Sequence, residues 1–346
     1  MTTPRHRQIT YPLTAKPDVG EWQHIDEDLV WLRMPLPITL GSVNVFLLRD
    51  GDGWAAVDTG MQTPDCQAVW ERARDEVLGP DGATRVLVTH MHPDHVGMAG
   101  WLCRESSARL WMPRLEYFLC RILVADTGRE APTDGVAFYR AAGLNDEEVA
   151  RYQNLFGMFG RVVSTMPDAY VRVTEGDMFD TGHHRFEVLS GNGHSPEHAC
   201  LLDRERNLFI AGDQLLPTIS SNVSVWPTEP DANPLAGWLD SCHRLREALP
   251  EDVLVLPGHG KPFTGAHERL TQLIDEHEKG LAAITDACAS PKRAVDLFPQ
   301  LFKSPITDAN RTMATGEAVA HVNYLLATGD LEIDDVRDGV RFYKQS

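Results

Sequence analysis

The stretch Thr89–Gly97, THMHPDHVG, most constrains what this chain can fold into. It holds three histidines and an aspartate within six positions: His90, His92, Asp94 and His95. Imidazole and carboxylate groups are the side chains that zinc and similar divalent ions prefer. Because such an ion needs about four ligands, a turn this rich in them predicts a metal site that other segments complete.

The rest of the chain repeats one pattern, an apolar run that ends at an aspartate or a histidine. GWAAVDTG contains Asp58, HRFEVLSGNGH ends at His194, NLFIAGD ends at Asp213, and DVLVLPGHG contains His259. Short apolar runs bounded by glycine predict β-strands. Ligand-type side chains that follow several strands gather at one edge of the sheets, so we expect a single site.

Strands and helices alternate along most of the chain, which predicts an α/β fold. LVWLRMPLP, VNVFLLRDG and GWAAVDTG are typical of successive antiparallel strands. CQAVWERARDEVL has helical spacing, and further helices are expected over about 235–249 and 266–285. The helices would therefore cover sheets whose ends carry the ligand-type residues.

The predicted ligands suffice for two borderline-soft divalent ions. One ion takes His90, His92 and His194, the other takes Asp94, His95 and His259, and Asp213 bridges them. A hydroxide shared between ions about 3.5–4 Å apart becomes a nucleophile near neutral pH. We therefore expect Asp94 and Asp213 to serve catalysis as the carboxylates that hold the ions around this hydroxide.

Four motifs, THMHPDHVG, GHSPEH, AGD and PGHG, resemble in this order the metallo-β-lactamase superfamily, in the dinuclear hydrolase branch that includes glyoxalase II. The resemblance covers about residues 29–270. It implies an αββα sandwich with two metal ions at one edge, and it gives ligand roles to the seven residues named above. It also implies that Asp58 steadies the metal cluster. His198 either orients a ligand or has a plain structural role.

The sequence differs from other branches of the superfamily, and these differences make some substrates unexpected. True β-lactamases of this fold have a cysteine ligand, whereas this chain adds His95 and has Asp213 at the bridging position. Flavodiiron proteins have a glutamate where His92 stands. Glyoxalase II presents basic residues to glutathione, and only Lys261 offers a counterpart. Lactam and glutathione substrates are therefore not expected.

The chain is expected to divide into an N-terminal extension (1–20), a catalytic domain (21–284) with a helical insertion at about 113–170, and a small winged-helix-like C-terminal domain (285–346). The C-terminal domain carries seven Lys and Arg against nine Asp and Glu. Its net charge of −2 favours packing or formation of a homodimer over DNA binding.

Two segments are expected to contact the substrate. The insertion is rich in aromatic residues, among them Phe156 and Phe159. It forms either a helical pair that buries its own apolar face or a lid that gives the site an apolar wall. The loop that follows Asp213 contains Trp226, which we also expect at the substrate.

Composition limits the possible partners and the compartment. A formal charge of −18 repels nucleic acid. The sequence shows neither a signal-like apolar run nor a stretch of membrane-spanning length, so a cytoplasmic protein without membrane association is expected. Six scattered cysteines favour reduced thiols over disulfides.

Together these features predict a cytoplasmic dinuclear metallohydrolase, with zinc as the first expectation and iron or manganese as alternatives. Its substrate would be a small molecule with an apolar acyl part and an ester-like carbonyl, a thioester first. A lactonase and a phosphodiesterase are the alternatives with the same metals. An iron-dependent sulfur dioxygenase would instead use His90, His194 and Asp213 for one iron. A non-catalytic regulator is disfavoured because the ligand set is complete.

Overall fold

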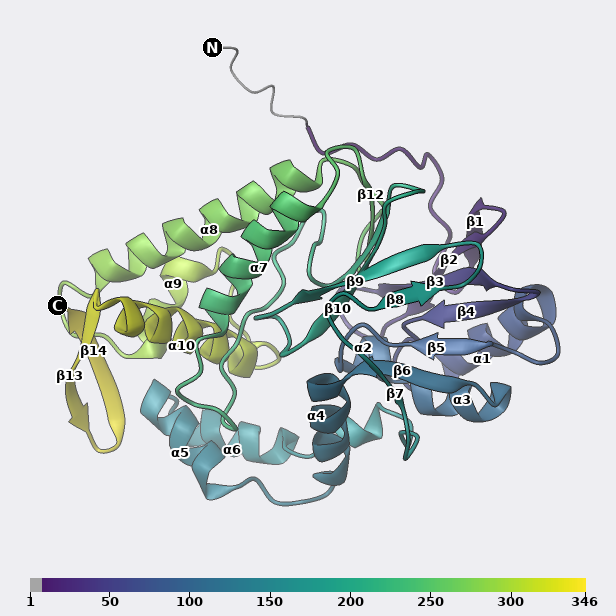
Figure 1. Ribbon diagram of the computed structural model, residues 1–346. Coiled ribbons are helices and arrows are strands. Elements are labelled where there is room, and N and C mark those ends of the chain that lie inside the picture. Colours follow the sequence, from purple (N-terminus) through teal and green to yellow (C-terminus); the bar gives the residue numbers. More distant parts are fainter. Residues whose placement is uncertain (1–7) are drawn as a thin grey trace, which may run out of the picture.

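The computed structural model describes residues 8–346, and in it two β-sheets lie face to face with helices on both outer sides (Figure 1). The expected αββα arrangement is confirmed. The first seven residues of the expected N-terminal extension lie outside the described residues.

The first sheet has seven strands in chain order. The first four pair antiparallel and the later ones pair parallel, with helices α1 (Pro64–Ala73) and α3 (Ala99–Ser106) between parallel strands. The strands are β1 (Trp22–Asp26), β2 (Leu29–Pro35), β3 (Ser42–Asp50), β4 (Gly53–Val57), β5 (Arg85–Leu87), β6 (Arg109–Pro113) and β7 (Val171–Val173).

The second sheet has five strands in the order β12-β11-β10-β9-β8. Helix α7 (Pro234–Ala248) connects its two parallel strands, and α8 (Ala266–Ala287) follows the last strand. The strands are β8 (Met178–Asp180), β9 (Arg185–Gly191), β10 (His198–Asp203), β11 (Leu208–Gly212) and β12 (Leu254–Pro257).

The central strands are buried on both faces, which explains their continuous apolar sequences. In β2, Leu29 and Trp31 face the second sheet, whereas Val30 and Leu32 face the helices. Successive side chains of a strand point to opposite faces, so each central strand contributes to two cores.

The segment between β6 and β7 is helical, as its sequence indicated. It contains α4 (Arg114–Ala125), α5 (Thr133–Ala142), α6 (Asp146–Leu155) and a short 3-10 helix (Phe159–Arg161). Asn145 caps the start of α6: its side chain accepts from the Glu148 amide, while the Glu148 carboxylate accepts from the Asn145 amide. This reciprocal cap satisfies two amides that have no partner within the helix.

The C-terminal segment packs against the helices of the second sheet. It contains α9 (Phe298–Leu301), α10 (Arg311–Thr328) and a hairpin of β13 (Leu331–Arg337) and β14 (Val340–Gln345). Apolar residues of α10, including Val322 and Leu325, share one core with Trp238 of α7. Helix α8 runs across the expected boundary between residues 284 and 285, and the division into domains stays a prediction.

The six cysteines are free and buried, in agreement with the reduced thiols expected from the sequence. Within residues 8–346, no helix combines the length and the apolar character that crossing a membrane requires.

A buried asparagine joins the two sheets at the edge where the ligand-type residues gather. The side-chain amide of Asn44, in β3, donates to the carbonyl oxygens of Pro257 (2.8 Å) and Gly260 (2.9 Å) in the loop after β12. Its Oδ1 accepts from the Trp31 indole at 2.8 Å, and its backbone amide donates to the Gly258 carbonyl at 2.7 Å. This one residue therefore holds a loop of the second sheet against the first.

Replacing Asn44 by alanine removes the two side-chain hydrogen bonds to Pro257 and Gly260 and keeps the backbone hydrogen bond to Gly258. It also leaves the buried Trp31 indole without its acceptor. We expect the free energy of unfolding to fall by roughly 2–4 kcal/mol, because each buried group that loses its partner costs about 1–3 kcal/mol. The matched control is Asn323→Ala, which removes two hydrogen bonds to the carbonyls of Pro230 and Ala232 at a half-buried position and should cost about 1 kcal/mol or less. Urea unfolding measures both, and equal losses would contradict the role given to Asn44.

Candidate metal centre

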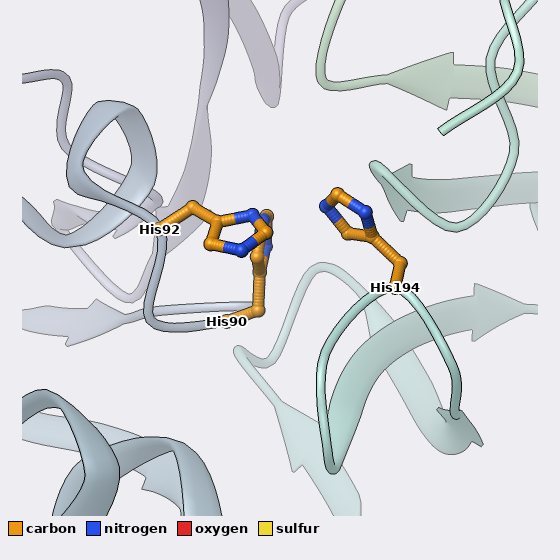
Figure 2. A group of neighbouring side chains, drawn as sticks. All are labelled: His90, His92 and His194. Atoms are coloured by element: carbon orange, nitrogen blue, oxygen red, sulfur yellow. The ribbon is translucent and has the colours of Figure 1, made fainter. Parts of the chain in front are cut away.

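Loops that follow strands of both sheets meet at one edge and bring together all seven residues expected to bind metal. Their nitrogen and oxygen atoms form three overlapping groups, in each of which all atoms lie within 4.8 Å of one another. The groups are His90, His92 and His194; His90, His95 and Asp213; and Asp94, His95 and His259. Figure 2 shows the first group, with His90 and His92 on one loop and His194 facing them from another.

The proline in HPDH sets the local geometry of the first loop. Pro93 is the first residue of the single-turn helix α2 (Pro93–Val96), and His92 precedes it in an extended conformation. Proline favours this position because its fixed φ suits a helix and the first turn needs no amide donor from it. The His95 amide then donates to the His92 carbonyl at 2.9 Å. All four ligand-type residues are thereby confined to one tight turn.

Glycine is required where backbone segments crowd the cluster. A Cβ atom on Gly258 would lie 2.2 Å from Asp213 Oδ1 and 2.8 Å from His95 Cε1. On Gly97 it would lie 2.4 Å from the Pro93 carbonyl oxygen. The glycines of PGHG and HVG therefore let the loops approach the cluster closely.

Hydrogen bonds to the backbone fix the ring orientation of two histidines. Nδ1 of His194 lies 2.8 Å from the carbonyl oxygen of Asn222, and Nδ1 of His259 lies 2.9 Å from that of Ser42. A carbonyl oxygen can only accept, so each Nδ1 carries the proton. In their neutral form these rings therefore turn Nε2 toward the cluster without a proton, which is the form that binds a metal.

Asp58 lies directly behind the cluster. Its backbone has a φ of 63°, a left-handed conformation that aspartate tolerates better than most residues. Its carboxylate accepts from the Thr89 amide (2.8 Å) and the Thr89 hydroxyl (2.9 Å), and it lies 2.8 Å from His95 Nδ1. This position suits the expected steadying role, which stays a prediction.

His198 also lies next to the cluster. Its Nε2 accepts from the backbone amide of Asp213 at 3.1 Å. Its ring stacks on His90, with 4.6 Å between centroids and 26° between planes. Both contacts suit a role for His198 in orienting a metal ligand, and this role also stays a prediction.

Buried carboxylates dominate the electrostatics of the cluster. Burial by itself lowers the pKa of His95, but the carboxylates of Asp213, Asp58 and Asp94 raise it well above its usual value. The pKa of His259 is likewise lowered by burial but raised to about 10 by Asp213 and Asp94. Without metal, the rings of both histidines therefore carry an additional proton, and their positive charges offset the carboxylates of the cluster.

His90 and His92 behave in the opposite way. Burial and then the neighbouring histidines lower the pKa of His90 well below its usual value. Burial followed by the proximity of His194 lowers the pKa of His92 to about 3. These rings are neutral at physiological pH and are ready to bind a metal.

Three buried polar atoms of the cluster lack a hydrogen-bond partner within residues 8–346: His95 Nε2, His194 Nε2 and Asp213 Oδ1. His95 Nε2 approaches Asp213 Oδ1 at 3.3 Å, and His194 Nε2 approaches Asp213 Oδ2 at 3.6 Å. Unsatisfied buried groups are rare, and a bound cation is one reason for them. The nitrogen and oxygen set is therefore compatible with a site for two metal ions.

A cavity of about 640 Å³ opens directly onto the cluster. Its floor contains His92, Asp94, His194, Asp213 and His259. Its walls are largely apolar and come from separate segments: Ile38, Leu40 and Met61 near the first sheet, Leu119, Leu123, Phe156, Met158 and Phe159 of the insertion, Leu216, Ile219 and Trp226 of the loop after β11, and Met313 of α10. The insertion and the Trp226 loop thus lie where the substrate contacts were expected.

Glu116 is a buried residue of the site that the sequence did not reveal. It lies in the first turn of α4, and its carboxylate accepts from the Met91 amide (2.9 Å) and the Glu197 amide (2.7 Å). It therefore joins the loop of His90 to the loop of His198. Burial raises its pKa to about 7 despite these hydrogen bonds. The surrounding helix sequence contains no motif that marks this acid as buried.

Comparisons with known proteins agree with this geometry. The family model described as Metallo-beta-lactamase superfamily matches residues 38–259, and the one described as Metallo-beta-lactamase-like, C-terminal domain matches residues 281–346. The crystal structure of a beta-lactamase domain protein from Burkholderia ambifaria is 37% identical, with a TM-score of 0.89 over 98% of each chain.

Two curated relatives have lower identity. The probable metallo-hydrolase YqjP of Bacillus subtilis is 24% identical over 319 residues, which are 87% of this chain and 93% of the relative. The human acyl-coenzyme A thioesterase MBLAC2 is 25% identical over 270 residues, which are 74% of this chain and 87% of the relative. The superfamily match spans more than half of this chain and includes every residue of the cluster. The chain therefore belongs to the metallo-β-lactamase superfamily.

Proposed function

We propose that this protein is a dinuclear metallohydrolase that cleaves a thioester with an apolar acyl part. The observation that carries the proposal is the apolar cavity with the histidine and aspartate cluster at its floor. Its volume lies within the range of about 300–1,000 Å³ that is usual for small-molecule sites. An acyl chain along the apolar walls would bring its carbonyl carbon to the cluster.

Seven residues would hold the two ions, with zinc as the first expectation and iron or manganese as alternatives. His90, His92 and His194 would form one site, Asp94, His95 and His259 the other, and Asp213 would be shared. Two such ions supply Lewis acidity for the carbonyl and lower the pKa of water to near neutrality. The backbone partners of His194 and His259 would keep both rings in the metal-binding orientation.

The lining of the cavity favours an apolar acyl part over additional charged groups. Among the described lining residues there is no lysine or arginine, and Asp126 is paired with Arg129. Away from the two proposed ions, the phosphate or carboxylate groups of a charged substrate would therefore have no basic side chain to contact inside the cavity. The same argument disfavours glutathione within the cavity.

The relatives support a thioester over a lactone. MBLAC2, which covers 74% of this chain, is named as an acyl-coenzyme A thioesterase. In this proposal the leaving thiol would occupy the mouth of the cavity, where the side chain of Trp226 is 40% exposed. Phe156 and Phe159 would contact the acyl chain.

The proposal predicts that kcat/KM rises from acetyl to medium-chain acyl thioesters. Each methylene group of the acyl chain that the wall buries should increase kcat/KM roughly three- to fourfold, which corresponds to about 0.8 kcal/mol. Phe156→Ala and Phe159→Ala should flatten this preference with metal content unchanged. Phe118→Ala is the control, because Phe118 belongs to the same insertion but is 51% exposed and lies outside the cavity lining.

Rates measured on thioesters, lactones and phosphodiesters, together with metal analysis, decide between the candidate activities. Faster turnover of lactones or phosphodiesters than of thioesters would contradict the thioester assignment. One iron ion per chain together with oxygen consumption would contradict the hydrolase assignment and favour a sulfur dioxygenase.

Replacing Asp213 by alanine should abolish hydrolysis and release at least one metal ion, because within residues 8–346 only the Asp213 carboxylate approaches both His194 (3.6 Å) and His259 (3.5 Å). Asp58→Ala should cost about 10–100-fold in metal affinity or activity, because it removes a group that orients a ligand. Asp126→Ala, at an aspartate that lines the cavity outside the cluster, should keep both ions. Metal analysis after dialysis checks all three, and an Asp213→Ala protein with two ions and full turnover would exclude the shared role.

The protonated state of the metal-free cluster predicts that metal affinity rises with pH. Neighbouring carboxylates raise the pKa of His95 well above its usual value and that of His259 to about 10, so both rings carry an additional proton that metal binding has to expel. From about pH 6 to about pH 8, the apparent affinity should rise about 10- to 100-fold per pH unit, for one or two protons released. Competition with a chromophoric chelator measures it, and a pH-independent affinity would contradict this account.

A further inference from the structure

We propose that Glu317, in α10 of the C-terminal segment, is a positioning residue for the metal site. It holds Asn222 in the place where the Asn222 backbone carbonyl orients His194. The C-terminal segment would thereby complete the catalytic centre of the preceding fold. This inference rests on the proposed ligand role of His194 but not on the identity of the substrate.

The first link connects the expected ligand to a loop without regular structure. Asn222 lies between β11 and α7, and its carbonyl oxygen accepts from Nδ1 of His194 at 2.8 Å. Groups that bind the second nitrogen of a metal-ligating histidine fix its tautomer and its orientation. Because the loop itself contains no strand or helix, the position of this carbonyl depends on contacts with other segments.

The second link connects the loop to the C-terminal segment. The side-chain amide of Asn222 donates to the Glu317 carboxylate at 2.7 Å, and its Oδ1 lies 2.6 Å from the Ser224 hydroxyl. The Ser224 hydroxyl also lies 3.1 Å from the carbonyl oxygen of Met313, another residue of α10, but its single proton goes to the closer Asn222 Oδ1. The Asn222 amide is thus held at one end by Glu317 of α10 and at the other by Ser224 of its own loop.

Close backbone contact keeps α10 against this loop. The Val225 amide donates to the Gly316 carbonyl at 3.0 Å. A Cβ atom on Gly316 would lie 2.8 Å from both the Ser224 Cβ and the Val225 carbonyl oxygen. Glycine therefore allows the helix and the loop to touch, and Glu317 follows it at once in the sequence.

A carboxylate at this half-buried position is a costly way to achieve packing alone, since an apolar side chain of similar size needs no polar partner. Burial raises the pKa of Glu317 to about 7, although the Asn222 hydrogen bond opposes this rise. What the site needs at this position is an acceptor for the Asn222 amide. Glutamine retains such an acceptor, whereas leucine fills similar space without one.

The test measures zinc affinity by chelator competition on the full-length protein. Glu317→Leu should weaken binding of the more labile ion by about 10–100-fold. Glu317→Gln should stay within about threefold of wild type, because it keeps the acceptor. Glu332→Leu is the control, at an exposed glutamate of the C-terminal hairpin, and should leave the affinity unchanged.

A double-mutant cycle shows whether Glu317 acts through Asn222. In an Asn222→Ala background, Glu317→Leu should have no further effect on zinc affinity. The visible spectrum of the cobalt-substituted protein should change in Glu317→Leu and match wild type in Glu317→Gln. Unchanged zinc affinity and an unchanged cobalt spectrum in Glu317→Leu, or full additivity with Asn222→Ala, would overturn the inference. A wild-type protein that binds no metal would instead overturn the proposed function on which it rests.

Discussion

The carboxylate of Asp213 lies among histidines from both sheets, and the architecture around it depends on neutralising this buried charge. His95 lies in the short helix α2, which follows β5 of the first sheet, and His259 lies in the loop after β12 of the second sheet. Both approach Asp213 within 3.5 Å. A buried charge is tolerated only when it is paired or binds a cation. The two sheets therefore have to meet at this edge, and protons or metal ions have to accompany the acids. The hydrogen bonds of Asn44 hold the two sheets in that contact.

The residues around the cluster act mainly through backbone groups. His194 and His259 are oriented by carbonyl oxygens, while Asp58 and Glu116 accept from backbone amides. Backbone groups are placed by the fold itself, so their positions do not depend on flexible side chains. Placing so many backbone groups beside the cluster requires close packing. Gly258 allows this packing because it has no side chain at a position where a Cβ atom would lie 2.2 Å from Asp213 Oδ1. Preorganised ligands bind a metal without further ordering.

The sequence predicted the αββα arrangement and the convergence of the ligand-type residues because both follow from local patterns. Apolar runs that end at His194 or Asp213 indicate strand ends, and strand ends share an edge. The sequence could not predict Glu116 or Glu317, because their partners are distant in the chain. Glu317 meets Asn222 across 95 positions, and only the packing of α10 brings them together. The buried Glu116 and the half-buried Glu317 look like ordinary helix-surface residues until the tertiary structure is known.

The walls and the floor of the cavity have different structural origins. The floor is built from loops at the strand ends of the two sheets, whereas most of the wall comes from the insertion, the loop after β11 and the start of α10, with Ile38, Leu40 and Met61 added from loops of the first sheet. Substitutions at wall residues such as Phe156 and Phe159 can therefore alter which molecules fit, whereas Asn222, in the loop after β11, also contacts His194. Such separation lets related chains diverge in substrate while one reactive centre is inherited unchanged. The same separation makes the insertion a natural place to exchange segments between relatives when a new specificity is wanted.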